Sequence, residues 1–322
     1  MITDLPSTTT SVVNRTLVEL REKGGAVALG RVLTLVIVTD DGAQAEDAIR
    51  AANDASREHP CRVLVVARGA KRAAARLDAQ IRVGGDAGAS EVVVLRLYGP
   101  LAEQGASVVV PLLLPDAPVV AWWPGDAPDS PSSDPLGTLA QRRITDAATQ
   151  RNPARWLDSR RRAYRPGDTD LAWTRVTQWR ALLAAALDQP PFEDVTGAVV
   201  SGAGDSPSTD LLAAWLAAAL GVAVRREEAP TGRGIVSVVL ERPSGPVRLD
   251  RPDGRTGTLS QPGQPDRRVA LARRPVNDCL AEELRRLDPD EVYRAALDAL
   301  PGVAGRVGAP RRRAAATAKA GR

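Results

Sequence analysis

The sequence predicts an α/β protein: an N-terminal mixed or mostly parallel sheet with flanking helices, followed by a second, smaller α/β domain of α+β character. The chain has 322 residues, which favours two domains over one. Two apolar runs, 32–38 and 62–67, have the length of strands buried on both faces and enclose a helical segment, as in a parallel sheet. The order strand, glycine-rich loop and helix recurs over 195–220, which indicates the second domain.

The first elements follow from their apolar patterns. Apolar residues at helical spacing predict an amphipathic helix over 10–23, ended by the glycine pair 24–25. A second helix, over 43–57, connects the strands 32–38 and 62–67, and a connection of this length predicts a right-handed parallel crossover.

The next elements extend the first sheet. Residues 77–84 and 91–98 alternate polar and apolar side chains, so we expect strands with one partly exposed face, added as an antiparallel extension. A helix opened by a proline is expected over 100–113, and it leads into a short apolar strand, 118–123.

That strand ends on the adjacent Trp122 and Trp123, and Pro124 stops it. Because neighbouring strand residues point to opposite faces, we expect one ring in the core and the other emerging at the carboxyl end of the strand. Open α/β sheets keep their binding surfaces at that end. The alternative is that both rings pack at the edge of the core.

An arginine-rich segment, 141–165, comes next, and an apolar helix over 173–187 follows it. Guanidinium groups could bind phosphates there with Trp156 stacked on the ligand, or the segment could form a protein interface, where Trp and Arg are enriched. A solvated helix face, with Asp146 and Asp158 as ion-pair partners, is the third interpretation. The arginines are Arg142, Arg143, Arg151, Arg155, Arg160, Arg161, Arg162 and Arg165.

The second domain is expected to begin with a strand over 195–201 and a helix over 211–220. Short strands separated by Pro/Gly turns are expected within 222–274, and a closing helix over 277–300. The predicted division is an N-terminal α/β domain 1–140, an arginine-rich helical bridge 141–192, a C-terminal α/β domain 193–304 and a disordered basic tail 305–322.

The loop between the first strand and helix of this domain, 202–210, is the best candidate for binding a small anion. Glycines allow tight turns, and free amides at the start of a helix attract phosphate. The pattern lacks the third glycine of Gly-x-Gly-x-x-Gly, and Asp205 would repel a phosphate. The alternative is that the hydroxyl side chains only cap the helix. The candidate residues are Gly202, Gly204, Ser206, Ser208 and Thr209.

The formal net charge of +4 comes from the tail. Residues 305–322 hold six positive charges and no acid, which leaves −2 for the rest of the chain. We favour a solvated, disordered tail over a nucleic-acid or partner-binding arm. No apolar run approaches the roughly 18 residues of a membrane helix, and the sequence does not open like a signal peptide, so we expect a cytoplasmic protein without a membrane partner.

His59 is the only histidine, and Cys61 and Cys279 lie far apart without a Cys-x-x-Cys pair. A histidine-based triad and a histidine proton relay need a second histidine, and a zinc cluster needs more ligands. We therefore expect a protein that is not an enzyme and that holds no cofactor and no metal.

Three segments carry a resemblance to a known family: Val-Val-Ala-Trp-Trp-Pro at 119–124, Arg-Arg-Ile-Thr-Asp at 142–146, and Asp-Ser-Pro-Ser at 205–208 leading into the helix at 211–216. In order and spacing they resemble the OpcA family of glucose-6-phosphate dehydrogenase assembly proteins of high-GC Gram-positive bacteria and cyanobacteria. The resemblance covers roughly residues 10–300, and the tail lies outside it.

The resemblance implies a non-catalytic assembly factor or allosteric activator that binds glucose-6-phosphate dehydrogenase and supports NADPH production in the oxidative pentose phosphate pathway. Cyanobacterial relatives are linked to redox control through cysteines, whereas this chain has only Cys61 and Cys279. The alternative function is a sugar-phosphate-binding enzyme or sensor that uses the 202–210 loop. The family offers no established catalytic residues, so the candidates for partner contact come from residue chemistry: Trp122, Trp123, Pro124, Arg142, Arg143, Asp146, Arg155 and Trp156.

Overall fold

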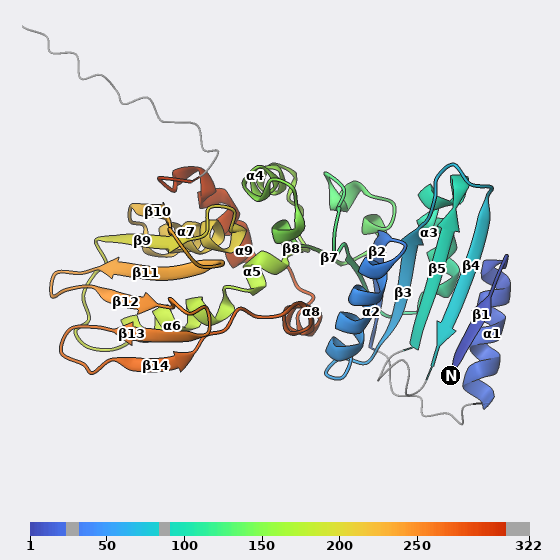
Figure 1. The fold of residues 1–322 in the computed structure, drawn as a ribbon, viewed down its shortest axis with the longest axis horizontal. Helices are drawn as coiled ribbons and strands as arrows, with labels where there is room; N and C mark the ends of the chain where they lie inside the picture. Colours follow the sequence, from blue (N-terminus) through green and yellow to red (C-terminus); the bar gives the residue numbers. More distant parts are fainter. Residues whose placement is uncertain (24–31, 84–90, 307–322) are drawn as a thin grey trace, which may run out of the picture.

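The computed structural model describes residues 1–23, 32–83 and 91–306. These residues form an eight-stranded sheet and a six-stranded sheet at the two ends of an elongated molecule, with helices around and between them (Figure 1). The first sheet is mostly parallel, and the second is smaller and mixed. The predicted fold class is therefore confirmed.

The first sheet is built from strands of three to eight residues. Its strands are β1 (Ile2–Leu5), β2 (Leu33–Asp40), β3 (Cys61–Arg68), β4 (Arg76–Arg82), β5 (Glu91–Tyr98), β6 (Val119–Trp122), β7 (Arg142–Thr145) and β8 (Asp168–Asp170). They lie in the order β1-β4-β5-β3-β2-β6-β7-β8. From β5 to β8 all neighbours are parallel, whereas β4 is antiparallel to both β5 and β1. The predicted parallel pair β2–β3 is confirmed. The antiparallel extension is confirmed for β4, but it is wrong for β5, which pairs in parallel with β3 and is mostly buried.

Helices cover both faces of the first sheet (Figure 1). On one face, α1 (Thr10–Lys23) packs through Leu17, which confirms the first predicted helix; its predicted glycine end lies outside the described residues. On the other face, α2 (Ala43–Ala55) lies beside α8 (Val276–Arg285), which comes from far later in the chain. Leu280 of α8 is buried in the same apolar cluster as the central strands. The C-terminal part of the chain thus completes the core of the first sheet.

The prediction of one continuous helix over 100–113 is wrong. The segment forms three short turns, η2 (Gly99–Glu103), α3 (Gly105–Val109) and η3 (Val110–Leu112). Pro111 has no amide hydrogen to donate, so an α-helix cannot continue through it with all its hydrogen bonds.

Trp122 and Trp123 enter opposite faces of the first sheet, as strand geometry requires. Trp122 packs in the cluster beneath α2 and α8, and Trp123 in the cluster beneath α1. The expectation that one ring emerges at the strand end is wrong, because the two residues are 1% and 0% exposed. Residues before β7 cover Trp123: a Cβ on Gly137 would lie 3.3 Å from its ring, and Leu136 joins the same cluster.

Two strands of the first sheet, β7 and β8, lie in the segment where the sequence analysis placed a helical bridge. Arg143 of β7 donates from Nε to the Asp168 carboxylate of β8 over 2.5 Å and from Nη1 to the Ala140 carbonyl oxygen over 2.8 Å. Arg142 and Arg143 of β7 have acidic partners, and Asp170 of β8 accepts hydrogen bonds from the Ala147 and Ala172 amides, so such polar strands can form at the edge of the sheet. The helical part of the segment includes α4 (Pro153–Ala163). The domain boundaries at 140 and 192 stay a prediction.

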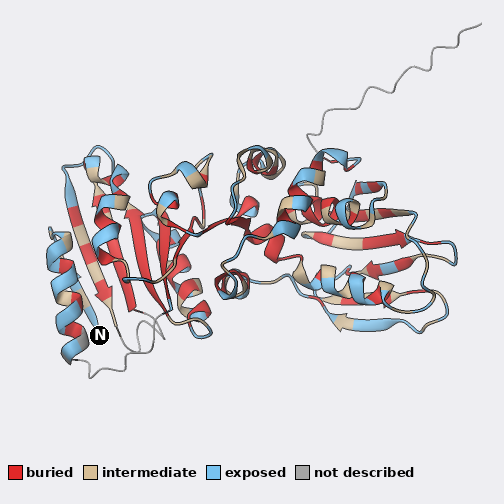
Figure 2. Cartoon of the chain, turned by 180° about the vertical axis from the view of Figure 1, so that it is seen from behind, coloured by how far each residue is buried: buried red, intermediate tan, exposed pale blue. Residues whose placement is uncertain are grey.

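The second sheet is mainly antiparallel. Its strands are β9 (Gly197–Gly202), β10 (Val224–Glu228), β11 (Ile235–Glu241), β12 (Val247–Asp250), β13 (Thr256–Ser260) and β14 (Arg267–Ala270). They lie in the order β10-β9-β11-β12-β13-β14, and only β9 and β10 are parallel neighbours. Buried and half-buried residues alternate along β9, whereas β2 and β3 are buried along nearly their whole length (Figure 2). The second sheet therefore has one well-covered face.

Two short turns, η4 (Pro131–Ser133) and η5 (Gly137–Leu139), lie between β6 and β7 in the chain. The remaining helices pack near the second sheet, and several contribute to its core. They are α5 (Leu171–Thr174), α6 (Thr177–Leu187), α7 (Pro207–Leu220), α9 (Glu291–Ala299) and the short η6 (Ala147–Thr149) and η7 (Leu300–Gly302). The prediction of a single closing helix over 277–300 is wrong, because the segment forms two helices. α8 ends before Pro289, and the Asp290 carboxylate caps α9 by accepting from the Tyr293 amide over 2.9 Å. In the described part of the chain, no helix is long and apolar enough to span a membrane.

Arg306 does not belong to a solvated tail, contrary to the sequence analysis. It is 6% exposed and donates to Asp210 of α7 over 3.3 Å and to Asp158 of α4 over 3.2 Å. Its charge is thus used to join the end of the described chain to two helices. The rest of the predicted tail, 307–322, lies outside the described residues.

Candidate functional site

The 202–210 loop joins the carboxyl end of β9 to the amino end of α7. Gly202 is needed there for close packing, since a Cβ would come within 2.5 Å of the Gly234 carbonyl oxygen. Ser206 caps α7: its hydroxyl accepts from the Thr209 amide over 3.3 Å and from the Thr209 hydroxyl over 2.8 Å. The Ser208 hydroxyl donates to the Ala172 carbonyl oxygen over 2.8 Å. These hydroxyl groups therefore already have structural partners, as the capping alternative expects.

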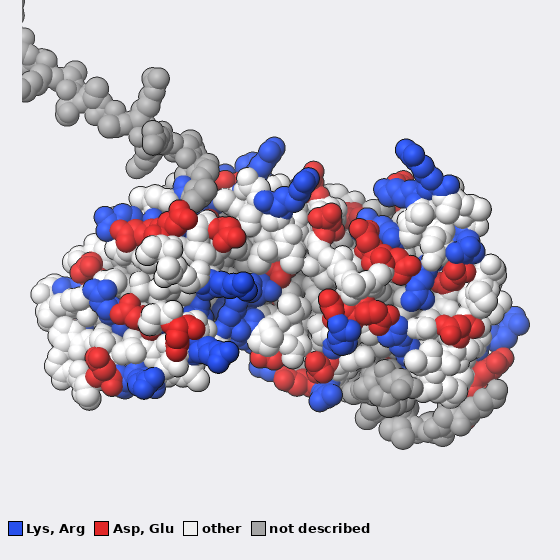
Figure 3. Space-filling view, in the orientation of Figure 1, with Lys and Arg blue, Asp and Glu red and all other residues white. Residues whose placement is uncertain are grey.

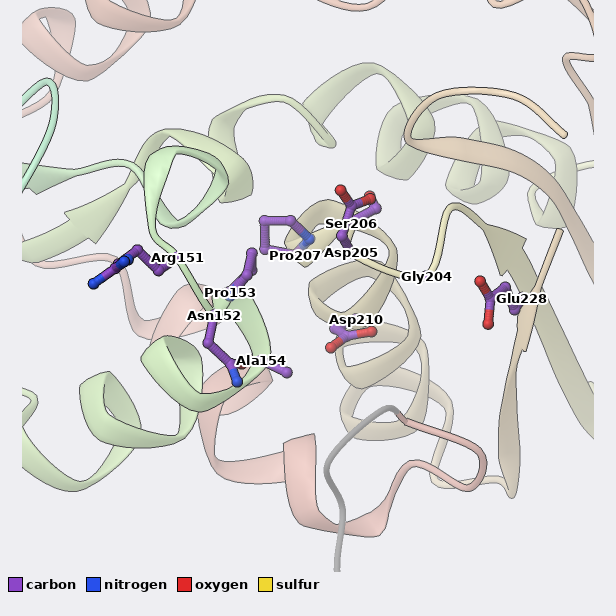
Figure 4. A pocket seen from close by; sticks show the side chains of 10 residues that line it. All are labelled: Arg151, Asn152, Pro153, Ala154, Gly204, Asp205, Ser206, Pro207, Asp210 and Glu228. Carbon is purple, nitrogen blue, oxygen red and sulfur yellow. The ribbon is translucent and has the colours of Figure 1, made fainter. Parts of the chain in front are cut away.

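On one side of the loop lies a cavity of about 430 Å³ rimmed by acids. The start of α4 forms one wall, and the loop with Glu228 forms the other (Figure 4). Asp205, Asp210 and Glu228 line it, and Arg151 extends away from the other labelled side chains. Asp210 is paired with Arg226 and Arg306, so Asp205 and Glu228 supply the negative charge that makes this side a poor site for an anion.

On the other side lies a cleft of about 530 Å³ that we call the basic cleft. Its charged lining consists of Arg175, Arg233, Arg251, Arg273 and Asp205. Lys and Arg side chains gather in a hollow near the middle of the face shown in Figure 3, close to the start of β11 that Arg233 precedes. The first turn of α7, with Ser206 at its cap, forms part of the same wall. The loop thus separates an acidic cavity from a basic cleft.

One of the four cleft arginines has a buried acidic partner. Arg175 donates both terminal nitrogens to the Asp146 carboxylate, over 2.8 and 2.6 Å, and both residues are buried. Burial alone would lower the pKa of Arg175, but the hydrogen bonds with Asp146 and its negative charge raise it. Asp146 therefore balances the charge of Arg175.

Arg251 is different, because its buried charge is met only by uncharged groups. It is 4% exposed and donates to the carbonyl oxygens of Leu271 over 2.9 Å and Ile235 over 2.6 Å. Its guanidinium lies 5.1 Å from the ring centre of Trp179, and its Nε is buried without a hydrogen-bond partner among the described residues. Burial and then the nearby charge of Arg273 lower the pKa of Arg251.

Most of the residues predicted for partner contact are buried inside this chain. Arg142 donates to Glu283 of α8, over 2.8 Å from Nε and 2.5 Å from Nη2, and Arg143 is paired within the first sheet. Trp156 is 9% exposed and Arg160 stacks on its ring. Of the predicted set, only Arg155 is exposed, while Pro124 is half-buried; Trp122, Trp123 and Asp146 are buried with the others.

The sequence analysis missed the arginines of the basic cleft. Arg233, Arg251 and Arg273 each stand just before or after a strand or between elements, in turn segments without a periodic pattern. Only the pairing of β9 with β11 and the return of the chain after β14 bring them to the 202–210 loop. The available signal was a set of arginines beside Pro and Gly turns in 222–274, which by itself suggests only solvated turns.

The described residues contain no cluster of His, Cys, Asp or Glu that could hold a metal ion. Cys61 and Cys279 are both buried and form no disulfide. Burial raises the pKa of the Cys279 thiol to about 11, so little thiolate exists at neutral pH.

Comparison with protein families shows which family the chain belongs to. Residues 52–162 match the model of the glucose-6-phosphate dehydrogenase subunit N-terminal domain, and residues 166–297 match that of the C-terminal domain of the same subunit. The chain belongs to the OpcA family. The matches cover β3 to β8 of the first sheet of this OpcA-family protein and the whole second sheet, while β1 and β2 precede them. They include the 202–210 loop, the basic cleft arginines and α8.

Two solved structures share a general likeness with this OpcA-family chain. One is a 3-ketoreductase, KijD10, from Actinomadura kijaniata in complex with NADP, with 10% identity, a TM-score of 0.41 and coverage of 83% of this chain and 95% of that chain. The other is a trehalose-6-phosphate protein from E. coli bound with UDP-2-fluoro glucose, with 11% identity, a TM-score of 0.24 and coverage of 61% and 65%. No curated protein matches the sequence.

Proposed function

We propose that this chain is a non-catalytic subunit that binds glucose-6-phosphate dehydrogenase and raises its activity, by promoting the active oligomer or by an allosteric effect. The observation that carries the proposal is the match to both domains of the dehydrogenase subunit, in order along one chain, over residues 52–297. In this role the protein supports NADPH production in the oxidative pentose phosphate pathway, in the cytoplasm.

The use of charged residues in the fold supports a role without catalysis. Arg142 with Glu283, and Arg175 with Asp146, are buried pairs that join segments of the chain. The one histidine of the sequence, His59, follows the end of α2. Polar groups that are buried in internal pairs are not available for a substrate.

Partner contact must use side chains that reach the surface. From the predicted set we retain Arg155 and Pro124 as contact candidates. We add Phe192, the only phenylalanine of the sequence, which is 77% exposed after the end of α6. Aromatic side chains, Phe among them, are enriched in protein interfaces. The buried tryptophans can act only as support for such a surface.

An activator works by binding the active state of its partner more tightly than the inactive state. A difference of about 1–3 kcal/mol gives roughly 5- to 150-fold coupling. The experiment is a titration of the dehydrogenase from the same organism with this protein, following initial NADPH formation, with the oligomeric state measured by sedimentation in parallel. We expect saturable activation or a larger fraction of active oligomer, and no NADPH formation by this chain alone.

A matched pair of variants tests the surface. Phe192→Ala should weaken dehydrogenase binding at least about 10-fold without a change in the free energy of unfolding, because the side chain contacts mainly solvent. Val110→Ala, at a 49% exposed site near the first sheet, should bind as the wild type does. No complex at micromolar concentrations together with an unchanged rate would reject the proposed function; equal binding by both variants would remove only Phe192.

A further inference from the structure

The basic cleft holds positive charge that lacks a carboxylate partner. Among the residues in the described part of the chain, no carboxylate lies within ion-pair distance of Arg233, Arg251 or Arg273. Burial of a charged group without a counter-charge costs free energy, and Arg251 is 4% exposed. Such an arrangement is expected where a ligand provides the counter-charge.

The electrostatics of the cleft favour an anion with more than one negative charge. With Arg175 balanced by Asp146, the three guanidinium groups face the single carboxylate of Asp205, an excess of two positive charges. The amino end of α7, a helix of 14 residues, adds partial positive charge to the same wall. A phosphate monoester has a charge of about −1.5 to −2 at neutral pH, whereas one carboxylate has a charge of about −1.

The size of the cleft indicates a ligand larger than inorganic phosphate. Its volume of about 530 Å³ lies in the range of sites for small organic molecules, roughly 300–1,000 Å³. A phosphate near the guanidinium groups therefore leaves space in the cleft for an organic body.

We propose that the basic cleft binds the phosphate group of a small phosphorylated metabolite through Arg233, Arg251 and Arg273. Guanidinium groups suit this role because their paired N–H groups match the geometry of phosphate oxygens. Arg251 is held in place by the Leu271 and Ile235 carbonyl oxygens, while Arg233 and Arg273 are exposed at the cleft. The site belongs to this chain alone and does not depend on the proposed dehydrogenase partner.

The test is calorimetric titration of the isolated full chain at low ionic strength. Glucose 6-phosphate serves as a phosphorylated probe, inorganic phosphate as its competitor and glucose as the neutral control. We expect saturable binding of glucose 6-phosphate, competition by phosphate and no binding of glucose. Arg233→Gln and Arg273→Gln should each weaken binding about 10- to 100-fold, the effect of losing a hydrogen bond to a charged group.

Two further variants keep the test specific. Arg248→Gln removes the same charge from an exposed site on β12 outside the cleft and should bind as the wild type does. Asp205→Asn removes the negative charge at the cleft and should tighten binding several-fold. Arg251 is left unchanged because its carbonyl contacts support the fold.

The proposal is overturned if neither glucose 6-phosphate nor phosphate binds at millimolar concentration, or if both cleft variants bind like the wild type. It is also overturned if Arg233→Gln and Arg273→Gln weaken only the complex with the dehydrogenase, since the cleft would then receive acidic groups of the partner. Because phosphate binding is measured without the dehydrogenase, failure of this proposal leaves the proposed function standing.

Discussion

At the scale of single residues, Asp170 stands at the end of β8, where the first sheet leads into α5. It is fully buried between β8 and α5, and its carboxylate accepts from the amides of Ala147 and Ala172, over 3.0 and 2.9 Å, and from the Thr145 hydroxyl over 2.7 Å. Burial and then the neighbouring charge of Asp146 raise its pKa to about 6, against these hydrogen bonds, which lower it. The residue therefore titrates in a range where most surface aspartates stay ionised.

Asp170→Asn should flatten the pH dependence of stability. An unfolded aspartate has a pKa of about 3.9, so the raised folded pKa gives stability that is complete below about pH 4 and is lost as the pH rises through about 6. A shift of about two units corresponds to roughly 3 kcal/mol. Asparagine cannot titrate but retains an oxygen for the amides. Urea unfolding of both proteins from pH 4 to 7.5 should show the wild type losing this stability relative to the variant; parallel curves would contradict the assignment.

At the scale of elements, α8 is the helix whose position could not be predicted. Its apolar face is visible in the sequence and indicates that it packs on something, but not on which sheet. It crosses back to the first sheet through two ion pairs of different kinds: Arg142 with Glu283, both buried, and Arg285 with Glu58, both more than half exposed. The Glu283 carboxylate also accepts from the Thr169 hydroxyl over 3.2 Å.

These two pairs allow a matched test of how α8 is held. Glu283→Gln should lower the free energy of unfolding by about 3–5 kcal/mol, because Arg142 is left buried without its counter-charge. Arg285→Gln on the same helix breaks an exposed pair and should cost at most about 1 kcal/mol. Chemical unfolding of the two variants measures the difference, and equal losses would show that the buried pair does not fix α8.

The sequence predicts elements whose signal is local, and it misses elements and site residues that depend on contacts between distant segments. Apolar runs such as 32–38 identify central strands, because these strands are buried on both faces. β7 and β8 escape detection because they are short and polar, and because the partners of Arg142 and Arg143 lie far along the chain. The 202–210 loop is recognisable from its glycines, whereas the arginines beside it depend on strand pairing. Local signals thus predicted the frame of the site but not its charge.

At the scale of the whole molecule, the two sheets form one protein because segments exchange between them. α8 covers the first sheet although it lies between strands and a helix of the second, and β7 and β8 lead from the first sheet into the helices beside the second. A cut of the chain after β8 would therefore leave the first sheet without α8, which completes its core. The end of the described chain also contacts earlier segments, since Arg306 forms ion pairs with Asp210 of α7 and Asp158 of α4.

The end of the chain therefore gives a sharp prediction about truncation. A chain ending at Arg306 should keep the unfolding free energy of the full protein and its effect on the dehydrogenase. The other five basic residues of the predicted tail follow Arg306 in the sequence and are not needed for its buried contacts. A chain ending one residue earlier loses a buried cation and leaves Asp210 with Arg226 as its remaining arginine partner. Burial already raises the pKa of Asp210, and loss of one cation should raise it further. We expect the shorter chain to be less stable by about 2–5 kcal/mol in urea unfolding at pH 7.

Arg306→Gln in the full-length protein should reproduce most of that loss and serves as the control for the free carboxyl terminus. Equal stability of the two truncated chains would show that the Arg306 contacts do not hold the C-terminal segment in place.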